Sequence, residues 1–127
     1  MSKLMLSGLL ALGLMGGAAL AQTAAPAAPA ETPKGKVLAN AKGMTLYTFD
    51  KDAPGKSNCN GPCAQSWPPL AAAADAKPSG DWTVVTRDDG SKQWAYKGRP
   101  LYAWSKDAKP GDTTGDGFNG AWRIAKP

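Results

Sequence analysis

Short runs of alternating apolar and polar residues make up most of the chain after residue 35, and turn-forming residues separate them. Alternation with a period of two is typical of half-buried strands, and no stretch keeps a helical period. We therefore expect an all-β fold, a small antiparallel sheet domain. The predicted strands cover residues 36–40, 44–49, 82–87, 91–96, 101–104 and 121–125.

Turn signals connect these runs in pairs. The segment Asp88-Asp89-Gly90 predicts a hairpin between two of the strands, because Asp-Gly is a strong hairpin signal. A second hairpin is expected across residues 41–43. Only residues 63–67 and 71–74 favour a helical turn, and the prolines that follow the first segment limit it.

One segment of the chain occurs twice. Lys42–Ala53 reads KGMTLYTFDKDA and Lys97–Ala108 reads KGRPLYAWSKDA, with seven of twelve positions identical. Trp67 and Trp122 have the same separation of 55 residues as the two segments. The chain is therefore a duplicated unit, and we expect two pseudo-symmetric repeats rather than a long repeat array.

Strand alternation gives the repeated segment a predicted geometry. In each copy the tyrosine and the aromatic residue two positions later share one face, and the leucine before the tyrosine points to the other. Both faces then carry apolar bulk, which favours a central strand covered on both sides and places the aromatics in the core. The residues are Tyr47, Phe49 and Leu46 in the first copy and Tyr102, Trp104 and Leu101 in the second.

The N-terminus predicts export. Lys3 precedes an apolar run from Leu4 to Leu20, and Ala19-Leu20-Ala21 is a signal-peptidase site, so residues 1–21 are expected to be a cleaved signal peptide. Residues 22–35 are rich in alanine and proline and are interpreted as a flexible linker. Residues 36–127 remain as one domain. We expect a periplasmic or extracellular protein that is soluble after cleavage and has no stable membrane insertion.

Charge and composition exclude several function classes. Without Lys3, the chain carries fourteen basic and ten acidic residues, scattered so that no basic run reaches three. This pattern does not support nucleic-acid binding. The absence of histidine excludes His-based triads, His-ligated haem and most zinc sites.

Cys59 and Cys63 are the only cysteines. An even count in an exported chain favours a structural disulfide between them. Paired cysteines at short spacing also exchange disulfides or bind copper, and this alternative stays open.

Asp52 and Asp107 recur five residues after the repeated tyrosines. An aspartate at a strand exit usually accepts hydrogen bonds from turn N–H groups, which is the interpretation we favour over a shared catalytic or cation site. Asp112, Thr114 and Asp116 resemble a calcium loop only weakly, because Arg123 occupies the position where an EF-hand needs glutamate. We predict no metal and no cofactor.

The chain has five tryptophans, and a small core is not expected to bury all of them, so some are candidates for binding. An exposed tryptophan can stack on sugar rings or dock a partner. The possible binding aromatics are Trp67, Trp82, Trp94 and Trp122.

Three elements together resemble a known family. The two Y-x-[FWY]-x-x-D matches, Cys59–Leu70 (CNGPCAQSWPPL) and the glycine-rich Pro110–Trp122 are similar to the bacterial secreted or lipoprotein repeat family with a conserved Yx(FWY)xxD motif. The resemblance covers residues 36–127 and implies no defined activity. Unlike the lipoprotein members, this chain lacks a lipid-accepting cysteine.

These observations predict a non-catalytic binding or structural module of the envelope or the cell exterior, not an enzyme. Its partner is expected to be an envelope component or polymer. The alternative is a periplasmic thiol-disulfide or copper-handling protein that uses Cys59 and Cys63.

Overall fold

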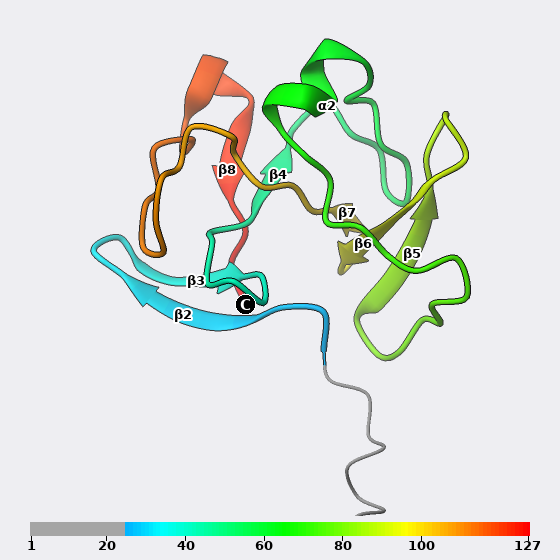
Figure 1. The fold of residues 1–127 in the computed structure, drawn as a ribbon, viewed down its shortest axis with the longest axis horizontal. Helices are drawn as coiled ribbons and strands as arrows, with labels where there is room; N and C mark the ends of the chain where they lie inside the picture. The colour runs from blue at the N-terminus through cyan, green and yellow to red at the C-terminus, as the bar shows by residue number, and fades with distance from the viewer. Residues whose placement is uncertain (1–24) are drawn as a thin grey trace, which may run out of the picture.

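The structure is a computed structural model and describes residues 25–127. The expected signal peptide and the first residues of the linker lie outside this part. The strands form three small antiparallel sheets, which confirms the all-β fold (Figure 1). The strands are β2 (Ala28–Thr32), β3 (Gly35–Ala39), β4 (Tyr47–Phe49), β5 (Trp82–Thr86), β6 (Lys92–Tyr96), β7 (Arg99–Pro100) and β8 (Trp122–Ile124); α2 (Pro62–Ser66) and the 3-10 turn η3 (Phe118–Gly120) are the helical elements.

The first hairpin corrects the linker prediction. β2 lies within the segment interpreted as a flexible linker, yet it pairs with β3 from Ala28↔Ala39 to Thr32↔Gly35. The Thr32 hydroxyl donates to the Gly35 carbonyl at 2.8 Å and fixes the turn, and Gly35 has a φ of 98°. An edge strand is held by main-chain hydrogen bonds, so an Ala-Pro composition with little apolar surface suffices.

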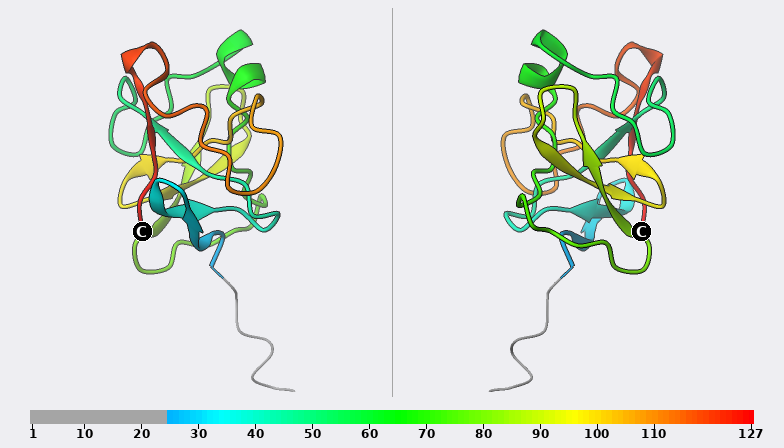
Figure 2. Two further views of the ribbon diagram at one scale, coloured as in Figure 1. Left: turned by 90° about the vertical axis from the view of Figure 1, so that its left-hand side faces the viewer. Right: turned by 90° about the vertical axis from the view of Figure 1, so that its right-hand side faces the viewer.

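The chain then turns at residues 40–44, as expected. Gly43 N–H donates to the Asn40 carbonyl at 2.9 Å, and Leu46 N–H donates to the Leu38 carbonyl at 2.9 Å. β4 is shorter than the predicted strand because it leaves β3 and pairs with β8, from Tyr47↔Ile124 to Phe49↔Trp122. Figure 2 shows the end of β8 reaching the β2–β3 hairpin, where Leu38 N–H bonds the Ala125 carbonyl at 2.9 Å.

The hairpin predicted from Asp89-Gly90 is confirmed. β5 and β6 pair from Trp82↔Tyr96 to Thr86↔Lys92, and β7 adds a short third strand. The strand predicted over residues 101–104 is wrong as a continuous element. Only Tyr102 pairs there, in isolated bridges to Tyr47 and Pro69, because the chain crosses between two sheets at this point.

One of the two possible helical turns forms. α2 covers Pro62–Ser66 and ends before Pro68 and Pro69. The alanine run 71–74 is not helical, and Ala71 instead bridges Gln93 beside β6. No helix within residues 25–127 is long and apolar enough to cross a membrane.

The two repeats meet at their tyrosines. Tyr47 N–H donates to the Tyr102 carbonyl at 2.7 Å, and Tyr102 N–H donates to the Tyr47 carbonyl at 3.0 Å. The predicted faces are confirmed: Tyr47 and Tyr102 belong to one core cluster, and Leu46 and Leu101 belong to the other. The pseudo-symmetric centre of the fold is therefore the segment that the sequence repeats.

Candidate functional site

Each repeated tyrosine bonds the aspartate of the other repeat. The Tyr47 hydroxyl donates to Asp107 Oδ2 at 2.7 Å, and the Tyr102 hydroxyl donates to Asp52 Oδ2 at 2.6 Å. Both tyrosine side chains are fully buried. The tyrosine of each motif therefore binds the aspartate of the other motif, and two hydrogen bonds link the repeats. The spacing of the residues along the chain did not predict this pairing.

The second oxygen of each aspartate holds a local turn. Asp52 Oδ1 accepts from the Asn58 N–H at 2.7 Å, and Asp107 Oδ1 accepts from the Thr114 N–H at 3.0 Å and from its hydroxyl at 2.6 Å. The geometry matches the turn-capping interpretation and extends it by the tyrosine bonds. Within residues 25–127, the two carboxylates have no hydrogen-bond partner in common.

Burial sets the ionisation of this network. It raises the pKa of the Tyr47 and Tyr102 hydroxyls, and the bond to aspartate adds to the shift, so both stay protonated donors at neutral pH. Burial also raises the pKa of the Asp52 carboxyl above 3.8, although the hydrogen bonds from Tyr102 and Asn58 oppose the shift.

Asp52 is expected to make stability depend on pH. Because its pKa is higher in the folded chain than in the unfolded one, its contribution to the free energy of unfolding falls as pH rises through the range just above 3.8. Asp52→Asn removes the ionisable group and with it this loss of stability. The free energy of unfolding of the variant minus that of wild type should therefore increase between about pH 3 and pH 7 in urea melts. A difference that shrinks over this range would contradict the burial of the carboxyl.

A stack of aromatic rings lies beside the tyrosines. Trp67 lies between Trp104 and Trp122, with ring centroids 3.9 and 3.8 Å away, and Trp122 stacks on Phe49 at 4.3 Å. The stack has the pseudo-symmetry of the repeats, since exchanging the two copies maps Phe49 onto Trp104 and Trp67 onto Trp122. A Cβ added to Gly115 would lie 2.7 Å from the Trp67 ring, so this glycine permits the close approach.

The prediction that Trp67 and Trp122 are binding aromatics is wrong. Trp67 and Trp122 are each only 3% exposed, so they are core residues and not surface aromatics. They belong to the repeat itself, and the 55-residue separation was a signal of their matched structural role. Trp82 and Trp94 are half-buried and remain candidates.

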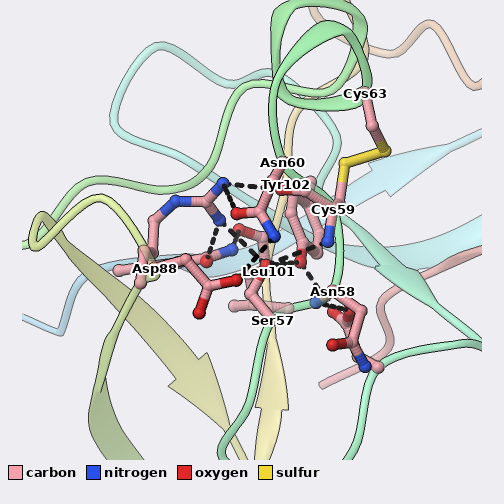
Figure 3. The surroundings of a disulfide bond; sticks show 11 residues. Ser57, Asn58, Cys59, Asn60, Cys63, Asp88, Leu101 and Tyr102 are labelled. Carbon is pink, nitrogen blue, oxygen red and sulfur yellow. Dashed lines mark hydrogen bonds between the residues drawn. A yellow bond between two sulfur atoms is a disulfide. The ribbon is translucent and has the colours of Figure 1, made fainter.

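A buried arginine is the main feature that the sequence interpretation missed. Arg87 is 5% exposed, and its guanidinium donates to Gln93 Oε1 at 2.7 Å, Ser57 Oγ at 2.9 Å and the Cys59 carbonyl at 2.6 Å. Ser57 also contacts the Tyr102 hydroxyl at 2.6 Å, so the arginine extends the tyrosine-aspartate network (Figure 3). Its position two residues after buried Val85 was the available signal, because alternate strand residues share a face.

The cysteine pair forms the predicted disulfide. The sulfur atoms of Cys59 and Cys63 are 2.04 Å apart, and the bond joins the first turn of α2 to the segment that receives Arg87 (Figure 3). Cys59 is fully buried and Cys63 is half-buried. Burial shields the Cys59 side of the bond from attack, which fits a local staple.

Replacing both cysteines with serine should lower the free energy of unfolding by about 2 kcal/mol, as expected for so short a loop. The bond should also resist mild reductant in the folded protein. Urea melts of Cys59→Ser/Cys63→Ser and thiol titration of the native wild type measure the two effects. Rapid reduction of the native bond, or catalytic reduction of a model disulfide, would contradict the structural role.

A family model described as "Secreted repeat of unknown function" matches residues 28–71 and 83–126. The chain belongs to this family. The two matches are offset by the same 55 residues as the repeated motif, and they confirm both the resemblance and the duplication. Membership in the secreted-repeat family makes this an exported protein. No curated protein and no solved structure matches the chain.

The glycine-rich loop of this secreted repeat uses its oxygens internally. Asp112 accepts from the Ala108 and Lys109 N–H groups at 2.8 and 3.1 Å, and Asp116 pairs with Lys34 at 3.3 Å. Within residues 25–127, no group of three or more carboxylate or cysteine side chains is placed to hold a metal ion. The loop therefore serves to shape the second repeat around Asp107.

The candidate binding surface of the secreted repeat lies on β5 and β6. Trp82, Trp94 and Tyr96 share one face of the hairpin because Trp82 pairs with Tyr96 and Trp94 is two residues away. We call these three residues the aromatic surface. The Trp82 ring lies 6.4 Å from Trp94 and 4.8 Å from Tyr96. Both tryptophans line a groove of about 670 Å³ that also contains Asp75 and Lys77.

Proposed function

We propose that this exported chain is a non-catalytic binding module of the cell envelope or exterior that uses the aromatic surface to hold its partner. The observation that carries the proposal is the half-buried pair Trp82 and Trp94 lining one groove. Aromatic rings of this kind supply contact area at low entropic cost, with polar groups nearby to orient a ligand.

The organisation of the repeats supports a role without catalysis. The motif tyrosines and aspartates bond each other, and the tryptophans of the stack fill the core. Their recurrence is therefore accounted for by the cohesion of the two repeats. The thiol-disulfide alternative would need attack on the half-buried Cys63, because Cys59 is fully buried.

The test is retention of the mature chain, residues 22–127, on insoluble envelope material, compared with two variants. Trp94→Ala should reduce retention at least tenfold, about 1.4 kcal/mol, because it removes a ring from the groove. Phe118→Ala removes an aromatic that is 40% exposed but lies elsewhere, and it should leave retention unchanged. Near-ultraviolet circular dichroism checks that both variants fold.

Three outcomes would overturn parts of the proposal. Absence of wild-type retention would remove the binding role. Equal retention of Trp94→Ala would place binding away from the aromatic surface. Copper bound stoichiometrically through the cysteines, or catalytic exchange with a model disulfide, would make the alternative function the better one.

A further inference from the structure

A group of cations lies next to the aromatic surface. Lys97, Arg99, Arg123 and Lys126 line one groove of about 250 Å³ together with Tyr96. We call these four residues the basic surface. In the sequence they are spread over thirty positions among acidic residues, and the fold brings them together. Lys97 and Arg99 also line a second groove, of about 470 Å³, so the two grooves meet at these side chains.

The carboxylates near the basic surface are already engaged. Asp50 binds Arg123 through both oxygens, at 2.9 and 3.1 Å, and Asp52 accepts from Tyr102 and Asn58. Within residues 25–127, no carboxylate lies within ion-pair distance of Lys97, Arg99 or Lys126. Three cations are therefore free to pair with an external anion.

Lys97 adopts a left-handed backbone conformation that lysine rarely adopts. It occupies the turn between β6 and β7 with a φ of 51°, followed by Gly98 at 83°. Asparagine and glycine fit two-residue turns of this kind, and a lysine there costs on the order of 1 kcal/mol. Its amine lies 5.2 Å from the centre of the Tyr96 ring. Residues in strained backbone conformations cluster at functional sites, which makes Lys97 a candidate for one.

The two surfaces form one path. Ring contacts lead from Trp94 to Trp82 and on to Tyr96, and Lys97 follows over the last ring. Aromatic faces stack on sugar rings, and guanidinium and ammonium groups pair with carboxylates. A ligand that satisfies the whole path is a chain of sugar rings that carries negative charge.

We infer that the chain binds a carboxylate-bearing polysaccharide, with sugar rings on the aromatic surface and carboxylates on the basic surface. This inference rests on the proposed binding function and names its partner class. A neutral glycan would leave the basic surface unused. DNA would use the basic surface too, but the chain belongs to a family of secreted repeats.

The test uses the mature chain and polygalacturonate as probe, with affinity measured by calorimetry at low ionic strength. Lys97→Asn/Arg99→Gln removes two charges from the basic surface and should weaken binding about tenfold. Lys36→Gln/Lys106→Asn removes two exposed charges that line none of these grooves and should leave the affinity unchanged. Added salt should weaken wild-type binding toward that of the first variant.

Lys97→Asn also separates binding from folding. Asparagine suits the turn, so this variant should melt at the same or a higher temperature than wild type while it binds polygalacturonate more weakly. If Lys97 had only a structural role, Lys97→Asn would not combine an unchanged or higher melting temperature with weaker binding.

Each remaining outcome decides against the inference. Wild-type protein that does not bind polygalacturonate, or a basic-surface variant that binds as tightly as wild type, would overturn it. So would neutral dextran that binds equally well, or DNA that binds more tightly and loses the same affinity in the variant. In these cases, retention on envelope material that depends on Trp94 would leave the proposed function standing.

Discussion

Trp67→Ala should lower the free energy of unfolding by about 4 kcal/mol, the range measured for deleting large core side chains. Trp67 lies at the middle of the stack, and its ring contacts Trp104, Trp122 and also Tyr47, at 5.4 Å in an edge-on arrangement. Its removal leaves a cavity between the two repeats. Small domains have total stabilities of about 5–15 kcal/mol, so the variant should unfold at much lower urea concentration.

Two variants calibrate this result. Trp67→Phe keeps an aromatic ring in the stack and should cost less than half as much. Phe118→Ala trims a ring at the exposed edge of the same cluster, 5.8 Å from Trp67, and should cost under about 1 kcal/mol. A loss below 1 kcal/mol for Trp67→Ala would mean that the stack does not hold the repeats together.

Arg87→Met is expected to have the second-largest effect, about 3 kcal/mol or more. Methionine keeps part of the buried volume but donates no hydrogen bonds. Gln93 Oε1 and the Cys59 carbonyl then lose the buried guanidinium that binds them. Each unsatisfied buried acceptor costs about 1–3 kcal/mol.

Arg87→Lys separates the charge from the hydrogen-bonding geometry. It keeps a cation but loses the planar fork that reaches four acceptors, so its loss of stability should fall between those of wild type and Arg87→Met. Urea melts of both variants measure the effects. Equal stability of Arg87→Lys and wild type would show that charge alone matters at this position.

The sequence predicted the parts of the fold that depend on local pattern. Alternation assigned Tyr47 and Leu46 to opposite faces, and the Asp-Gly signal placed the β5–β6 hairpin. Such features depend on neighbours along the chain. The β2 strand was missed because its Ala-Pro composition resembles a linker, and only pairing with β3 reveals it.

The candidate site was less predictable because it depends on contacts between the repeats. Spacing identified Asp52 as a turn residue, but which tyrosine it binds depends on how two copies pack. The burial of Arg87 depends on acceptors from two separate segments, the loop at Ser57 and Cys59 and strand β6 at Gln93. The basic surface likewise joins residues from β7, β8 and the C-terminus.

The tyrosine of each motif is bound by the aspartate of the other repeat rather than by that of its own. A double-mutant cycle of Tyr47→Phe with Asp107→Asn, followed in urea, tests it most directly. We predict a coupling energy of about 1–2 kcal/mol for this pair, and about 0.3 kcal/mol or less for Tyr47→Phe with Asp52→Asn, the aspartate of the same motif. Coupling within the motif that equals or exceeds the coupling between the repeats would contradict the account.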